Sequence, residues 1–199
     1  MSAPVGIVID VLRATSTMTQ ALAGDGVVLG GERKAVRIPG FDFGNSPSEF
    51  AGEPAGETLV LTTTNGTRLL VAAASRCDTV LVGSLLNLGA VVDAARASGV
   101  DEVGVLCAGV SGELVLDDAY VAGRIAEALD GQETDSAAAA IRLARTWGGA
   151  EEALSASLSA SNLRDAGLEQ DVAWCARESV LDVVPRLRGM VGTAAEVIA

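Results

Sequence analysis

Short apolar runs alternate along this chain with alanine-rich stretches whose apolar spacing is that of helices. Four of these runs end directly in a polar or glycine-containing cluster and lie at residues 6–10, 59–62, 79–83 and 103–107. Strands that alternate with helices are typical of a largely parallel sheet with helices on both faces. The carboxyl ends of such strands share one edge with the amino ends of the following helices, so we expect the functional residues at that edge.

The same pattern predicts the remaining elements. A helix is expected near residues 15–23, and residues 24–56, with clustered Gly and Pro, predict a hairpin or short strands carrying a long loop. Strand–helix units are expected at 58–62 with 66–75, 79–83 with 88–98, and 103–107 with 117–129. Beyond residue 130 we expect only helices, at 136–147, 150–166 and 168–177, followed by an apolar segment at 180–187. The whole chain, residues 1–199, is predicted to form a single domain.

Charge and hydrophobicity narrow the range of partners. The chain has 199 residues, of which 49% are hydrophobic, and carries a formal charge of -12. Nucleic acids and anionic membranes need a basic surface, so we expect neither as a partner. A small anionic substrate is still compatible, because a few arginines, backbone N–H groups or a Mg²⁺ ion can reverse the local charge.

The chain contains no histidine, which excludes every catalytic triad and zinc site that needs imidazole. Acid–base chemistry must then use carboxylates, water, Lys, Cys or Tyr, and an oxygen-rich metal site would suit Mg²⁺. The three cysteines, Cys77, Cys107 and Cys175, lack metal-ligand spacing and are expected as reduced thiols. No segment resembles a signal peptide or a membrane span, which predicts a cytoplasmic protein.

Asp10 and Arg13 lie at the end of the first predicted strand. A carboxylate there can hold Mg²⁺ or position water, and an arginine can bind a phosphate or carboxylate with two hydrogen bonds. The alternative is a buried Asp10 that caps the next helix and pairs with Arg13.

A polar run between a predicted strand and helix suits an anion site, because hydroxyl and N–H groups would face a phosphate there. Its candidate residues are Thr63, Thr64, Asn65, Gly66, Thr67 and Arg68. The alternative is a helix cap with a polar turn.

Two other strand ends carry polar candidates. Ser84 and Asn87 fit a helix cap better than a ligand site when taken alone. Asp117 and Asp118 open a predicted helix, where carboxylates either bind a metal or stabilise the helix dipole. Cys107 is interpreted as a packed residue, since no histidine can activate it.

Taken together and in order, these motifs closely resemble those of the 2-phosphosulfolactate phosphatase (ComB-like) family over nearly the whole chain. The motifs that carry the resemblance are 8–17, 31–33, 40–47 with Glu49, 63–67, 83–87 and 107–109, continuing through Asp118 and 122–123 and more loosely through Gly167, Asp171, Cys175 and 184–185.

The resemblance implies a three-layer α/β/α fold with a mixed, largely parallel sheet. It also implies a Mg²⁺-dependent phosphoric monoester hydrolase that converts 2-phosphosulfolactate, or a related 2-hydroxy-acid phosphate ester, to sulfolactate and phosphate, a step towards coenzyme M. Asp10, Arg13 and Asp118 would be catalytic, and Asp10, Glu49 and Asp118 would bind Mg²⁺. The expected substrate-binding residues are Arg33, Asn45, Ser46, Thr63, Thr64, Asn65, Gly66, Thr67, Arg68, Ser84 and Asn87.

The chain departs from the family pattern in two places. It lacks a strand-containing segment before the Asp10 strand and a strand–helix stretch before residue 30. Such losses expose a sheet edge unless another subunit covers it, so a homo-oligomer is a possible partner. The alternative function is a catalytically impaired relative that binds small anions.

Overall fold

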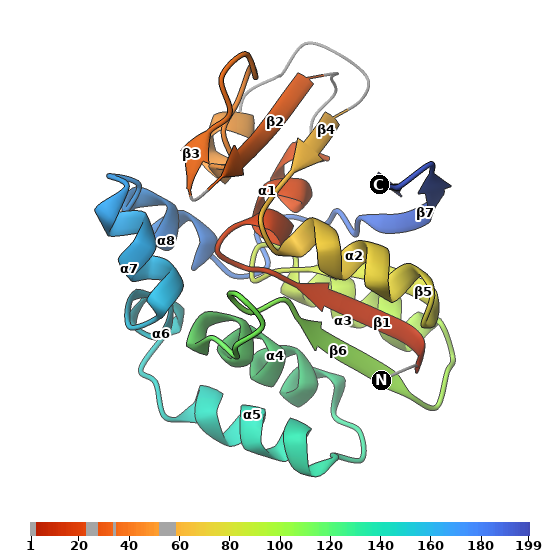
Figure 1. Cartoon of the computed structure of the whole chain (residues 1–199). Coiled ribbons are helices and arrows are strands. Elements are labelled where there is room, and N and C mark those ends of the chain that lie inside the picture. The colour runs from red at the N-terminus through yellow and green to blue at the C-terminus, as the bar shows by residue number, and fades with distance from the viewer. Residues whose placement is uncertain (1–2, 23–27, 34, 52–58) are drawn as a thin grey trace.

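The computed structural model describes residues 3–22, 28–33, 35–51 and 59–199, and its main element is a five-stranded sheet in the order β6-β1-β5-β7-β8. The strands β1 (Ala3–Ile9), β5 (Cys77–Gly83) and β6 (Val103–Cys107) pair in parallel. β7 (Arg186–Val191) is antiparallel to both β5 and β8 (Ala194–Ile198). The sheet is therefore mixed and largely parallel at its centre, as predicted (Figure 1).

Helices cover both faces of this sheet. Alternate residues of β1 point to opposite sides: Ile7 and Ile9 pack towards α3 (Leu88–Ala97) and α4 (Leu116–Leu129). Val8 packs with α1 (Ala14–Ala21) and α2 (Gly66–Ala74) on the other side. These two hydrophobic cores produce the predicted three-layer α/β/α arrangement, and α5 (Asp135–Arg145) packs outside α4.

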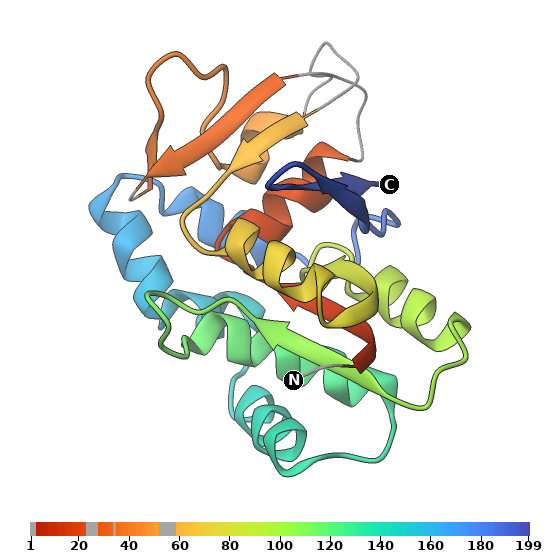
Figure 2. The ribbon, with the colours of Figure 1, turned by 45° about the vertical axis from the view of Figure 1, so that its right-hand side comes forward.

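A second, smaller sheet holds the region that was expected as a hairpin with a long loop. β2 (Val28–Arg33) is antiparallel to β3 (Val36–Arg37), and the loop after them contains the short 3-10 helix η1 (Pro47–Phe50). β4 (Leu59–Thr62) pairs in parallel with β2 and not with the main sheet. Figure 2 shows this sheet above α1 and the main sheet.

The C-terminal part differs from the sequence prediction in two ways. The helix expected over residues 150–166 is two helices, α6 (Ala150–Ser155) and α7 (Leu158–Asp165), because the Ser157 hydroxyl accepts the N–H of Ala160 and begins α7. After α8 (Gln170–Cys175) the chain forms the β7–β8 hairpin, where no strand was expected. This hairpin packs on α2 beside β5. None of the described helices is long and apolar enough to cross a membrane.

Candidate active site

Two buried carboxylates meet where β1 and β6 end. Asp10 directly follows β1, and Asp118 lies in the first turn of α4 after β6. The Asp118 carboxylate accepts the N–H of Val11 at 3.1 Å with one oxygen and the N–H of Gly109 at 2.9 Å with the other. Asp118 therefore ties the ends of the two neighbouring strands together and is held in one orientation.

The Asp10 carboxylate lies between the first turns of α1 and α2. One oxygen accepts the N–H of Ala14 at 3.4 Å, and the backbone N–H of Asp10 donates to the Thr15 hydroxyl at 3.1 Å. A Cβ atom added to Gly66 would lie 2.7 Å from Asp10 Oδ2, so only glycine lets α2 come this close. Gly66, the glycine of the polar run, thus allows the Asp10 carboxylate to lie against the start of α2.

Burial and mutual repulsion make these carboxylates hard to ionise. Desolvation, with smaller contributions from the charges of Asp117 and Glu32, raises the pKa of Asp10 to about 6. Burial raises the pKa of Asp118 well above its usual value, and the charges of Asp10 and Asp117 add to the effect. Burial likewise raises the pKa of Asp117, whose carboxylate accepts the Ser159 hydroxyl at 3.1 Å. A cation between these groups would relieve the repulsion.

The carboxylate pair fits a Mg²⁺ site. Within the described ranges no three Asp, Glu or Cys side chains come together as a complete set of metal ligands. Mg²⁺ does not need such a set, because proteins usually hold it with one or two carboxylates while water and substrate phosphate fill the other positions. Asp10 and Asp118 could supply those two carboxylates.

Glu49, the third predicted metal ligand, has its described contact with the loop before η1 and not with Asp10 or Asp118. Its side chain is in the exposed part of η1 and accepts the N–H of Gly44 at 2.6 Å. This contact closes the loop before η1. A metal-binding role for Glu49 stays a prediction.

Arg13 does not form the predicted alternative pair with Asp10. Its Nη1 lies 2.7 Å from Asp171 Oδ2, and both side chains are buried. The other oxygen of Asp171 accepts the Ser46 hydroxyl, so two predicted site residues, Arg13 and Ser46, meet at a residue of α8. Asn45, beside Ser46, is also buried, and its Oδ1 is one of the buried side-chain atoms in the described structure that lack a hydrogen-bond partner.

Most hydroxyls of the polar run before α2 are already engaged. Thr63 Oγ1 accepts the N–H of Thr67 at 3.2 Å, as a cap would, and the Thr67 hydroxyl donates to the Thr63 carbonyl. Thr64 donates both its N–H and its hydroxyl to Glu32, each at 2.8 Å. Sequence reasoning did not single out Glu32, a buried carboxylate near the end of β2 whose charge acts on Asp10. Its position at a strand end was the available signal.

The remaining members of that run face a cavity of about 370 Å³. It opens between the start of α2 and the loop that follows β6, and it is lined by Asn65, Arg68, Leu69, Ala108, Ser111 and Gly112. The cavity is therefore bounded by the turns on either side of the two carboxylates: Gly66 touches Asp10, and Gly109 donates to Asp118. Arg68 is the cation in its lining.

Ser84 and Asn87 are buried and fully engaged. Asn87 Oδ1 accepts the N–H and the hydroxyl of Ser84 at 2.9 and 3.1 Å. Its Nδ2 donates to the carbonyls of Val82 and Val183 at 3.1 and 2.9 Å. Asn87 stands at the N-cap position before α3, but its side chain makes no capping hydrogen bond, so the capping interpretation is correct only in position. Neither side chain lines a cavity described for the chain.

Arg33 and Cys107 are the remaining residues that the sequence singled out. The backbone of Arg33 ends β2, and its side chain lies outside the described part of the structure. Burial raises the pKa of the Cys107 thiol to about 12, with the charges of Asp118 and Asp117 adding to the effect, so Cys107 is a packed thiol and not a nucleophile.

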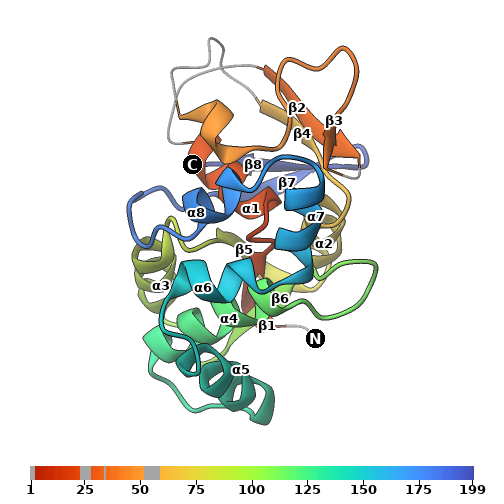
Figure 3. The ribbon, with the colours of Figure 1, turned by 90° about the vertical axis from the view of Figure 1, so that its left-hand side faces the viewer.

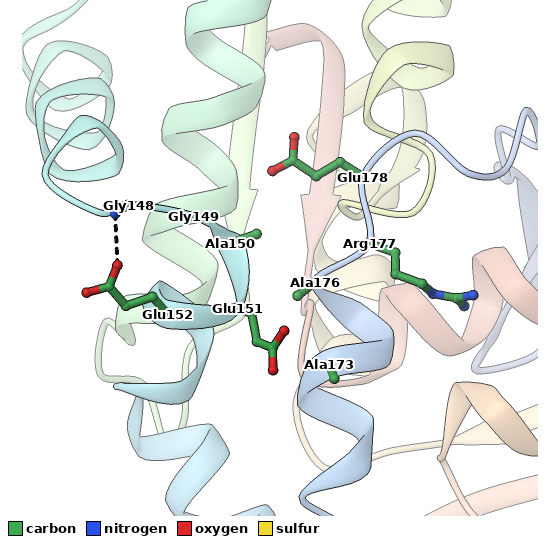
Figure 4. Close-up of a pocket in the computed structure, with 9 residues that line it drawn as sticks. All are labelled: Gly148, Gly149, Ala150, Glu151, Glu152, Ala173, Ala176, Arg177 and Glu178. Carbon is green, nitrogen blue, oxygen red and sulfur yellow. Dashed lines mark hydrogen bonds between the residues drawn. The ribbon is translucent and has the colours of Figure 1, made fainter.

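A larger cavity, of about 660 Å³, is lined by residues of the C-terminal helices and holds none of the predicted site residues. Figure 4 shows it between α6 and α8, with the side chains of Glu151 and Glu178 directed into the gap and that of Arg177 directed away. Glu152 also lines it and accepts the N–H of Gly148 at 2.9 Å. This acidic lining disfavours a phosphate ester, which leaves the cavity beside Arg68 as the better substrate site.

Comparison with known proteins agrees with the resemblance in the sequence. A family described as 2-phosphosulpholactate phosphatase matches residues 20–190. A probable 2-phosphosulfolactate phosphatase of Thermus thermophilus is 40% identical over 212 residues, covering 94% of this chain and 90% of the relative. That alignment is longer than the 199-residue chain, so the relative has residues that this chain lacks.

Two other relatives extend the match. A probable 2-phosphosulfolactate phosphatase of Deinococcus radiodurans is 38% identical over 92% of this chain and 87% of its own length. The 2-phosphosulfolactate phosphatase of Methanothermobacter thermautotrophicus is 36% identical over 92% of this chain and 86% of its own length. By name these relatives are phosphoric monoester hydrolases. With the match spanning most of its length, the chain belongs to the 2-phosphosulfolactate phosphatase family.

Proposed function

We propose that this protein is a Mg²⁺-dependent phosphatase that hydrolyses 2-phosphosulfolactate, or a related 2-hydroxy-acid phosphate ester, to sulfolactate and phosphate. The observation that carries the proposal is the buried pair Asp10 and Asp118, beside a cavity that contains Arg68. A cytoplasmic location and a role in coenzyme M synthesis stay predictions.

The two carboxylates have different roles in this proposal. Asp118, with both oxygens held by backbone N–H groups, is the rigid ligand for the cation. Asp10, whose Oδ2 faces the start of α2, would hold the cation and orient the attacking water. Bound Mg²⁺ supplies charge neutralisation at the phosphoryl oxygens and lowers the pKa of water. Without the cation, two buried carboxylates would repel the phosphate ester.

Neutral and cationic donors bind the substrate. Arg68 and Asn65 reach the cavity from the first turn of α2 and bind one anionic group of the ester. Turning the Asn45 side-chain amide would replace its unpartnered Oδ1 by Nδ2, which donates to a phosphate oxygen. Arg13 would add a further phosphate contact, because a guanidinium offers several N–H groups and Asp171 uses Nη1 alone among the described contacts.

Phosphate release from 2-phosphosulfolactate and from 2-phospholactate, with Mg²⁺ and with excess chelator, tests this function. We expect turnover of at least one ester that the chelator abolishes and added Mg²⁺ restores. Folded protein that binds either ester but releases no phosphate would contradict the proposal and would favour a small-anion binding module. Equal turnover with and without Mg²⁺ would contradict the metal dependence alone.

A further inference from the structure

We propose that Asp171 is a positioning residue for the phosphatase reaction and acts by fixing the guanidinium of Arg13. This inference rests on the proposed function. Arg13 opens α1 at the carboxyl edge of the sheet, and Asp171 is in the first turn of α8, 158 residues later in the chain. Their contact is a 2.7 Å ion pair whose side chains are 3% and 0% exposed.

The burial of this pair indicates a role beyond stability. A buried ion pair commonly contributes little net stability, because desolvating both charges offsets their attraction. What such a pair does fix is geometry, since the guanidinium cannot leave its partner without stranding a buried charge. Holding Arg13 through Nη1 leaves its other N–H groups in a constant direction for an anionic ligand.

Asp171 also fixes the loop that carries the other predicted donors. Its second oxygen accepts the Ser46 hydroxyl, and the Thr17 hydroxyl of α1 donates to the Asn45 carbonyl at 2.9 Å. One carboxylate therefore joins the start of α1, the loop before η1 and α8. Figure 3 shows α8 beside α1 and η1. Buried Asn45, whose Oδ1 has no described hydrogen-bond partner, lies in the same loop.

A second ion pair, between Arg124 of α4 and Glu178 just after α8, provides a control. Arg124 and Glu178 form two hydrogen bonds, at 2.6 and 2.9 Å, but both side chains are 31% exposed. Glu178 lines the acidic cavity, and the described hydrogen bonds of Arg124 go to Tyr120 and Glu178 and to none of the candidate site residues. Glu178→Gln therefore removes an ion pair without touching the site.

A double-mutant cycle tests the proposal. We expect Asp171→Asn to lower kcat/KM at least about tenfold in folded enzyme, because small displacements of a binding group cost this much. In an Arg13→Met background the same change should alter kcat/KM by less than about twofold, since Asp171 then has no guanidinium to hold. Glu178→Gln should leave kcat/KM unchanged. Additive losses, or a loss of stability without a loss of kcat/KM, would overturn the proposal.

A second variant, Asp171→Glu, and a second measurement, the affinity for inorganic phosphate, allow the proposal to be tested if Asp171→Asn does not fold or the wild type is inactive. If Asp171→Asn does not fold, Asp171→Glu keeps the charge but shifts the carboxylate by one methylene group, and the same tenfold loss and the same cycle apply. If the wild type releases no phosphate, the cycle is measured on the affinity for inorganic phosphate. A cycle on phosphate binding that is non-additive supports the role of Asp171 even though the phosphatase activity has failed, and an additive one rejects it.

Discussion

The carboxyl ends of β1 and β5, two paired strands of one sheet, carry buried polar residues with opposite properties. At the end of β5, Asn87 and Ser84 are neutral, and the Asn87 amide is matched by donors and acceptors of the chain itself. At the end of β1, burial and neighbouring charges raise the pKa of Asp10 and also that of Asp118, which contacts this strand end from the first turn of α4. The comparison teaches that polar residues at a strand end indicate a functional site only when their charges are not balanced by hydrogen-bond or ion-pair partners within the fold.

The largest effect that would sharpen this comparison is expected from Asp10→Asn. The amide keeps the shape but cannot hold a cation or orient water as a carboxylate does, so we expect turnover to fall by about a thousandfold or more. In chelator the same variant should melt about 5 °C higher near neutral pH, because it no longer ionises a desolvated group. Phosphate release and thermal unfolding measure the two effects. Turnover within tenfold of the wild type would contradict the assignment.

Gly66→Ala tests the same strand end through its backbone. The new methyl group would lie 2.6 Å from the Ala14 Cβ and 2.7 Å from Asp10 Oδ2, so α2 must move away from the carboxylate. We expect about tenfold lower kcat and a loss of about 2 kcal/mol in the free energy of unfolding. Gly131→Ala, where no atom lies within 4 Å of the new Cβ, is the matched control. Equal behaviour of the two variants would show that the close approach is unimportant.

Asn87→Ala probes the other strand end and should affect stability alone. It leaves the buried carbonyl of Val82 and the half-buried carbonyl of Val183 without their donor, which costs about 3 kcal/mol in the free energy of unfolding. The kcat of the folded fraction should change by less than about twofold. Urea unfolding and active-enzyme titration separate the two quantities. A selective loss of kcat would make Asn87 a site residue, as the resemblance to the family implied.

The last prediction concerns the pH dependence of stability. The pKa of Asp10 is 3.8 in the unfolded chain and about 6 in the folded protein, so the folded state binds the proton more tightly. Its stability contribution is therefore present below the unfolded pKa and is lost as pH rises through about 6, by about 3 kcal/mol in the absence of a metal. The difference in unfolding free energy between wild type and Asp10→Asn should follow this course. A difference that does not vary with pH would contradict the raised pKa.

The sequence predicted the central elements because their signals are local. The runs that became β1, β5 and β6 are largely apolar, and the helices after them begin at polar turns. The β7–β8 hairpin was missed because its residues alternate in exposure without a strong apolar run, and Pro185 precedes it. The placement of β4 in a separate sheet depends on pairing with β2, which no local pattern reveals.

The site was predicted in part for the same reason. Asp10 and Asp118 follow strands, so their convergence can be inferred from topology, and the structure joins them through Val11 and Gly109. The pairing of Arg13 with Asp171 spans 158 residues, and only the packing of α8 against the start of α1 creates it. Long-range contacts of this kind carry no signal in the spacing of residues along one chain.

The most direct test of the account is calorimetric titration of Mg²⁺, with inorganic phosphate present, into the wild type, Asp10→Asn, Asp118→Asn and Asn87→Ala near neutral pH. We predict binding to the wild type and to Asn87→Ala, and at least about tenfold weaker binding to both aspartate variants. Binding that survives in Asp10→Asn and Asp118→Asn, or that fails in the folded wild type, would contradict a metal site at the end of β1.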